Sequence, residues 1–177
     1  MAGQMRSIYV PPFRIDIDRR PGTARIVPDA RLARAIARGL ATANAPSPAS
    51  VALTLTDDAA LTELNAAHMG ADGPTDVLSF PILSPEAFLP QSRAAAFPLP
   101  PGARQPLGDI VVSVERAIEQ AETGRGGQTG EIRWSAADEL LLLVTHGTLH
   151  LCGWDHVEPQ EEAAMRALER RLLEARP

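Results

Sequence analysis

The 177-residue sequence contains no lysine, only one cysteine and no long run of apolar residues. Because Cys152 is alone, an intramolecular disulfide is excluded, and a reducing compartment such as the cytoplasm is the expected location. No stretch approaches the roughly 18 consecutive apolar residues of a membrane span, and the segment before Phe13 lacks the apolar core of a signal peptide. We therefore expect a cytoplasmic protein that is neither membrane-bound nor processed.

Without lysine, all 17 basic residues are arginine, and 22 acidic residues bring the formal net charge to -5. An acidic total argues against indiscriminate binding of nucleic acids, although it is compatible with a local basic face. Arg31, Arg34 and Arg38 share one face of a predicted helix, where they would either contact phosphates or form an ordinary solvated surface. The length and the 45% apolar content indicate one globular domain with its own core.

Four segments have the apolar patterns of β-strands. Residues 13–18 and 51–56 alternate apolar and polar side chains, which is typical of strands with one buried face. Between them, residues 29–42 carry leucine and isoleucine at every fourth position and predict a helix. Short apolar runs at 77–80 and 107–114 predict two more strands. This strand-helix-strand order favours a mixed sheet that is at least partly parallel.

The remaining helices are predicted at four places. Asp57 and Asp58 are N-cap candidates for a helix that closes near residues 68–70. A shorter helix is expected at 115–122, and residues 135–151 form the most apolar helix, which should be buried on most sides. A last amphipathic helix should present three apolar side chains to the body of the protein, namely Met165, Leu168 and Leu172.

A segment rich in proline and alanine, at about 81–106, interrupts this pattern without any sustained period. We expect it to be a long surface excursion, either a mobile loop or a lid. No internal repeat or second domain is apparent. The predicted fold is therefore a single α+β domain over residues 1–177, with a small mixed sheet and about five helices.

Three of the four histidines lie in one short segment, with the spacing H-x-x-x-H-x-x-G-x-x-H. His146 and His150 are four residues apart, so they lie on one face of the predicted helix and point to a common site. Gly153 can adopt the turn that brings His156 back as a third ligand. Three neutral imidazoles suit zinc and leave a fourth position open, as in catalytic sites. We predict one zinc ion at the end of the buried helix.

The spacing is also that of the metzincin proteases, but Gly147 occupies the position of their general-base glutamate. Peptide hydrolysis would then need another proton carrier. Asp155 is a candidate for that role or for orienting an imidazole, and a simple turn residue is an equally good interpretation. Cys152 lies inside the same segment and is better interpreted as a small buried residue than as a ligand. A metalloprotease is therefore a weaker alternative.

Four segments together resemble motifs of the YbeY family of bacterial and organellar endoribonucleases, also called rRNA maturation factors. They are E-L-N at 63–65, P-T-D-V-L-S-F-P at 74–81, L-G-D-I at 107–110 and H-G-T-L-H-L-C-G-W-D-H at 146–156. These motifs occur in the expected order and cover most of residues 50–157.

The resemblance implies an α+β fold with a cleft that holds zinc on His146, His150 and His156. The implied activity is metal-dependent cleavage of single-stranded RNA, in maturation of the 3′ end of small-subunit (16S) rRNA and in ribosome quality control. Precursor rRNA, the small ribosomal subunit and assembly proteins are then the expected partners. The family's P-T-D segment also implies that Asp76 and Ser79 lie near the cleft, where composition alone would suggest a turn cap and a strand residue.

One segment departs from the family pattern. After E-L-N the family typically has an aromatic residue, an arginine and a glycine, whereas this sequence has His68, Met69 and Gly70. A thioether cannot hold an RNA phosphate or offset negative charge in a transition state, as an arginine would. His68 is a candidate for supplying positive charge, or else a packing residue at the helix end. An alternative function therefore stays open, that of a non-catalytic, zinc-containing ribosome-assembly factor that binds RNA.

Overall fold

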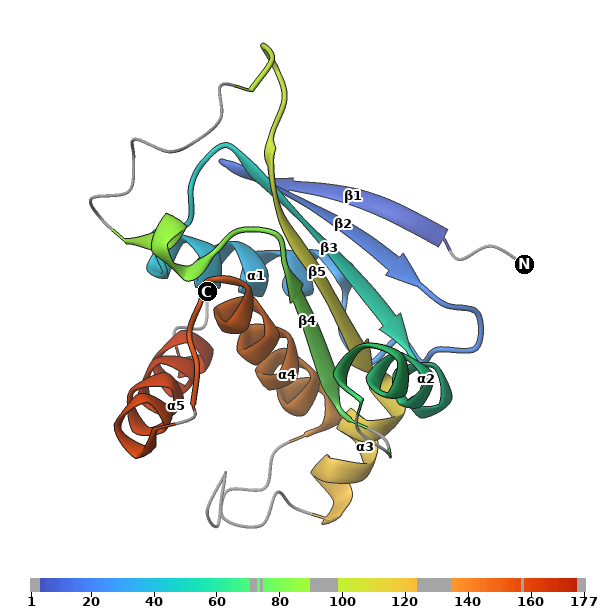
Figure 1. Cartoon of the computed structure of the whole chain (residues 1–177). Coiled ribbons are helices and arrows are strands. Elements are labelled where there is room, and N and C mark those ends of the chain that lie inside the picture. Colours follow the sequence, from blue (N-terminus) through green and yellow to red (C-terminus); the bar gives the residue numbers. More distant parts are fainter. Residues whose placement is uncertain are drawn as a thin grey trace.

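The computed structural model describes residues 4–70, 73, 75–89, 99–123, 135–156 and 158–174, without the side chains of residues 4 and 69. Its elements, in chain order, are β1 (Gln4–Val10), β2 (Phe13–Arg19), α1 (Asp29–Thr42), β3 (Ala49–Thr56), α2 (Asp58–Met69), β4 (Val77–Pro81), the 3-10 helix η1 (Pro85–Phe88), β5 (Gln105–Ser113), α3 (Val114–Thr123), α4 (Ala136–Leu151) and α5 (Pro159–Glu174) (Figure 1). The predicted α+β fold is confirmed. No helix in these ranges is both long and apolar enough to cross a membrane.

The five strands form one mixed sheet in the order β1-β2-β3-β5-β4. β2 pairs with β3 and β3 with β5 in parallel, whereas both outer pairs are antiparallel. The predicted β2-α1-β3 unit is therefore confirmed as a parallel crossover. β1 was not predicted, because its apolar residues fall on both alternating sets and give no clean period of two. Met5 and Tyr9 on this strand are 70% and 57% exposed.

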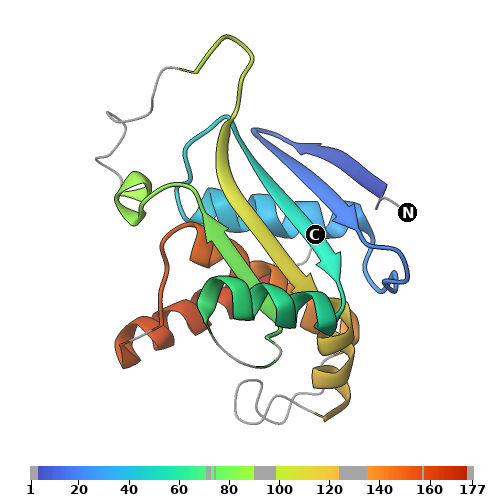
Figure 2. The same ribbon diagram turned by 45° about the vertical axis from the view of Figure 1, so that its right-hand side comes forward.

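Helices cover the sheet unequally on its two faces (Figure 2). On one face, α1 packs against β1 and β2, and α4 packs against β4 and β5. The alternating residues that β2 and β3 turn toward these helices are buried, as the period-two pattern predicts. α2 lies on the opposite face, over β4 and β5, and α5 packs against α4 and α1.

The apolar run of β5 is explained by burial on both faces. Ile110 and Val112 belong to the main core beneath α1 and α4. Val111 points the other way and packs with Leu61 of α2 and Leu78 of β4. Because helices pack on both faces of β5, its side chains do not have to alternate between apolar and polar.

α4 is the central helix, and its start is set by a capping box. The Ser135 hydroxyl accepts a hydrogen bond from the Asp138 amide, and the Asp138 carboxylate accepts one from the Ser135 amide. From Glu139 to Leu151 only His146 and His150 are not fully buried. The two histidines therefore mark the one side on which this helix meets an open surface.

The predicted excursion at 81–106 is shorter and more ordered at its ends than expected. Pro81 still pairs with Gly108 in the sheet, and Gln105 already pairs with Ala49. Within the excursion, η1 buries Phe88, which is 7% exposed and belongs to the main core. Proline at the first position of a 3-10 helix masks the helical pattern, and this explains why the prediction missed it. Residues 90–98 lie outside the described part, so the predicted lid stays a prediction.

Candidate metal centre and cleft

The last two turns of α4 bring His146 and His150 together at the surface of the protein. Their Nε2 atoms are 3.0 Å apart, and their ring centroids are separated by 4.5 Å. This follows from the spacing of four residues, since such side chains lie one above the other on a helix. His156 completes the group, with ring centroids 5.6 Å and 5.0 Å from the first two rings.

A tight turn after α4 positions His156. Gly153 has φ of +81°, and the Trp154 amide donates back to the Leu149 carbonyl while the Gly153 amide donates to the His150 carbonyl. These two bonds form a Schellman motif, which ends a helix at a left-handed residue. A Cβ at Gly153 would also lie 2.7 Å from the Cβ of Pro85. The predicted turn at Gly153 is therefore confirmed, and glycine also allows the close contact with η1.

His146 has a further partner that the sequence interpretation missed. Its Nδ1 lies 2.7 Å from Oε1 of Glu169, a residue of α5 that is 8% exposed. Glu169 falls four residues after Met165 and three before Leu172, inside the stripe predicted to be apolar. A carboxylate on the buried face of an amphipathic helix is the signal that would have identified it.

The donor set of the three histidines fits a metal ion. One nitrogen from each ring lies within 4.8 Å of the others. Burial, together with repulsion from His146 and His156, lowers the pKa of His150 below its ordinary value of 6.5, so its neutral, metal-binding form prevails at neutral pH. Among the described residues no fourth side chain joins the group, which leaves room for water or substrate.

Cys152 does not contribute to this centre. It is buried, 4% exposed, and belongs to the main apolar core. Burial raises the pKa of its thiol to about 12, whereas a metal ligand must be a thiolate. The interpretation of Cys152 as a small buried residue agrees with this environment.

A cleft of about 510 Å³ opens beside the histidines, between β4, η1 and the turn after α4. Asp76, Ser79 and Asp155 line this cleft together with the three histidines. The Ser79 hydroxyl donates to the Gly147 carbonyl at 3.0 Å. Asp155 is exposed, and its Oδ1 accepts a hydrogen bond from the His156 amide at 2.7 Å.

His68 is placed differently from these residues. It is exposed near the end of α2, its ring makes an edge contact with Phe80 at a centroid distance of 5.2 Å, and it does not line the cleft. The resemblance made it a candidate because it occupies the aromatic position that follows E-L-N, but α2 lies on the opposite face of the sheet from α4. Its contacts fit the packing interpretation, and a catalytic role for His68 has no support from this geometry.

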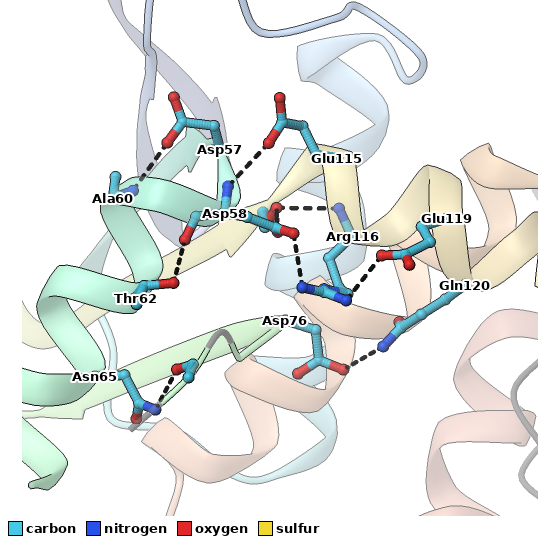
Figure 3. Close-up of polar contacts among 12 residues, drawn as sticks. Asp57, Asp58, Ala60, Thr62, Asn65, Asp76, Glu115, Arg116, Glu119 and Gln120 are labelled. Carbon is cyan, nitrogen blue, oxygen red and sulfur yellow. Dashed lines mark hydrogen bonds and ion pairs between the residues drawn. The ribbon is translucent and has the colours of Figure 1, made fainter. Parts of the chain in front are cut away.

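Asp76 is held at the cleft wall by α3 (Figure 3). Its Oδ2 accepts a hydrogen bond from Gln120 at 3.1 Å, and its backbone carbonyl accepts one from the Ser113 amide.

Nearby, Arg116 pairs with Asp58 at 2.7 Å and with Glu119 at 2.8 Å, and the Ser113 hydroxyl donates to Asp58. This network joins the ends of α2, β5 and α3, and it keeps Arg116 occupied with carboxylates. The predicted N-cap at Asp57 is also confirmed, since it accepts from the Ala60 amide.

Gly147, at the metzincin glutamate position, faces the sheet. A Cβ there would lie 2.8 Å from Ile110 Cγ2 and 3.0 Å from both Ser79 Oγ and Val77 Cγ2. A glutamate side chain therefore has no room at this position, and the general base of a metzincin protease cannot be supplied from it. The protease alternative loses its main structural requirement.

Arginines do not line the part of the cleft that the structure describes. Arg31, Arg34 and Arg38 border a separate shallow groove between α1, α4 and α5. Arg38 donates to the Leu172 carbonyl there at 2.8 Å. The side chain of Met69 lies outside the description, and α2 ends at this residue, followed by Gly70 with φ of +62°.

Comparisons with known proteins agree on one family. Residues 23–176 match the sequence profile described as Endoribonuclease YbeY. Among curated relatives, the endoribonuclease YbeY of Roseiflexus sp. (strain RS-1) is 40% identical over 162 residues, 91% of each chain. That of Symbiobacterium thermophilum is 43% identical over 134 residues, 76% of each chain. The solution structure of TM1509 from Thermotoga maritima matches with a TM-score of 0.51 at 24% identity, over 92% of this chain and 87% of that one, which supports the fold.

Proposed function

Because the chain belongs to the endoribonuclease YbeY family, it is a hydrolase that cleaves RNA in rRNA processing, and we propose that His146, His150 and His156 hold one zinc ion for this reaction. The observation that carries the proposal is the convergence of three ring nitrogens within 4.8 Å at the edge of a 510 Å³ cleft. A bound zinc ion would supply Lewis-acid stabilisation of phosphate charge. Three histidine ligands leave a coordination position for water or a phosphate oxygen.

The chain's own residues have distinct tasks in this cleft. Asp155 is a candidate for accepting or returning a proton beside His156, because it is exposed and lines the cleft with the three histidines. Ser79 donates to the Gly147 carbonyl and ties the cleft wall to the helix that carries the histidines. Asp76, steadied by Gln120, lies on the same wall and is a second candidate for proton transfer.

The substrate we propose is single-stranded precursor rRNA at the 3′ end of the small-subunit rRNA. A cleft of this size admits a nucleotide that is not stacked in a helix, and specific recognition of RNA usually targets unpaired segments. The net charge of -5 and the absence of arginine from the described cleft lining predict weak affinity for free RNA. Docking on the small subunit or on assembly proteins would then supply specificity. We propose that this cleavage takes place in the cytoplasm and also serves ribosome quality control.

The test is a comparison of wild type with His150→Ala for zinc content and for cleavage of a small-subunit rRNA precursor. We expect the variant to lose both, since one of three ligands is gone. His68→Ala is the matched control for zinc binding, because it removes a histidine outside the cleft. Full cleavage by metal-free His150→Ala would refute the zinc proposal.

The attacking group can be identified from the same products. A hydrolytic water leaves 5′-phosphate ends, whereas attack by the ribose 2′-hydroxyl leaves 2′,3′-cyclic phosphate ends. Digestion of an oligonucleotide with a single 2′-deoxy substitution at the cleaved position gives an independent answer. Loss of cleavage on that substrate would assign the attack to the 2′-hydroxyl.

One observation favours a second role as a non-catalytic assembly factor. The family's arginine is replaced by Met69, and no arginine from elsewhere lines the described cleft. Comparison of wild type with Met69→Arg on the rRNA precursor measures how this replacement affects the cleavage rate. A large gain in rate for the arginine variant would show that the methionine lowers the activity. A wild type that retains zinc and RNA but does not cleave would instead favour the assembly role.

A further inference from the structure

Glu169 of α5 makes a buried contact with His146 of α4. Glu169 is 8% exposed and lies among Met165, Leu168 and Leu172 on the inner face of α5. A carboxylate in such surroundings is costly unless it accepts a strong hydrogen bond. Its Oε1 lies 2.7 Å from His146 Nδ1, the short distance typical of a charge-assisted bond.

The contact engages Nδ1 of His146, whereas Nε2 of the same ring faces the other histidines. With Glu169 ionised, its carboxylate only accepts hydrogen bonds, and the proton of this contact then lies on Nδ1 of His146. The neutral ring then has its lone pair on Nε2. That atom lies 3.0 Å from Nε2 of His150, on the side where the three rings converge.

We propose that Glu169 is a positioning residue of the metal centre, which fixes the tautomer and the ring orientation of His146 so that Nε2 is presented to the metal. The inference rests on the proposed function, because it concerns the ion held by the three histidines. Carboxylates that accept from the second nitrogen of a ligand histidine orient the ring and raise its basicity, and their loss weakens metal affinity 10–100-fold.

A purely structural role predicts a different pattern of effects. α5 is held to α4 by the apolar cluster of Leu149, Met165, Leu168 and Leu172, and Arg38 donates to the Leu172 carbonyl. If Glu169 only helped this docking, replacing it by a similar apolar side chain would alter stability and leave zinc affinity unchanged. If it positions His146, zinc affinity must fall while the metal-free fold persists.

The experiment measures the zinc dissociation constant of the full chain by competition with a chromophoric chelator. We expect Glu169→Leu to bind zinc about 10–100-fold more weakly than wild type. Glu169→Gln should lose less than Leu, because its amide oxygen can still accept from Nδ1. Glu162→Gln is the matched control, since Glu162 lies on the same helix, is 44% exposed and pairs only with Arg166 among the contacts that the structure describes.

A second readout keeps the proposal testable if Glu169→Leu unfolds. The visible spectrum of the cobalt-substituted protein reports ligand geometry, and we expect it to change in Glu169→Gln but not in Glu162→Gln. Zinc affinity within twofold of wild type in a folded Glu169→Leu, or unchanged affinity and spectrum in Glu169→Gln, would overturn the inference. If the wild type itself binds no zinc, the proposed function fails instead, which separates the two results.

Discussion

Gly147→Ala is the substitution whose effect follows most directly from the packing of α4 against the sheet. The added methyl group would lie 2.8 Å from Ile110 Cγ2 and 3.0 Å from Ser79 Oγ and Val77 Cγ2. Ile110 is fully buried in a central strand, so it has little freedom to move away. The Ser79 hydroxyl would also be displaced from its 3.0 Å bond to the Gly147 carbonyl.

Two opposing terms determine the magnitude. Alanine in a helix interior is more favourable than glycine by about 0.5–1 kcal/mol. Forcing one extra carbon into a filled core costs about 1–3 kcal/mol. We therefore expect Gly147→Ala to lower the free energy of unfolding by roughly 1–2 kcal/mol, which for a chain of this size lowers Tm by about 2–8 °C.

The assay is urea or thermal unfolding of chelator-treated protein, so that metal binding does not add to the apparent stability. Gly39→Ala is the matched control, because Gly39 is also inside a helix but its added Cβ would approach only the Thr148 side chain, at 3.0 Å and 3.5 Å. We expect that variant to lose less stability than Gly147→Ala, because one side chain rather than three must shift. A Gly147→Ala protein as stable as wild type or more stable would refute the packing argument.

Three further predictions concern buried charge and titration. Asp29→Ala should destabilise the fold by about 3–5 kcal/mol, because it leaves buried Arg19 unpaired. Asp16→Ala, which removes the partner of the exposed Arg14, should cost less than about 1 kcal/mol by the same unfolding assay. Cys152, with its pKa raised to about 12, should not react with a thiol reagent at pH 8 until the chain is unfolded, and rapid native labelling would contradict its burial. Because the pKa of His150 is lowered from 6.5, the unfolded chain binds more protons below that pH, so metal-free protein should lose stability as pH falls through 6.5. His150→Gln should flatten the pH dependence of the free energy of unfolding measured in urea titrations. An unchanged slope of that free energy against pH would contradict this prediction.

Local patterns predicted those parts of the fold that depend on neighbours in the chain. The buried faces of α1 and of β2 and β3 follow from periods of about four and of two, and Leu32, Ile36 and Leu40 are all fully buried as expected. β1 escaped prediction because its apolar residues fall on both alternating sets, and Met5 and Tyr9 of this edge strand are exposed. η1 escaped because a four-residue helix beginning with proline has no period to detect.

The sequence by itself determined the histidine group, since the spacing of His146, His150 and His156 and the turn at Gly153 all lie within eleven residues and depend on local helix geometry. Only the tertiary structure decided what surrounds this group. Glu169 reaches His146 from 23 residues away, Ser79 reaches Gly147 from 68 residues away, and His68 is carried to the opposite face of the sheet. Such contacts depend on how helices pack across a sheet, and residue spacing along the chain does not encode that packing.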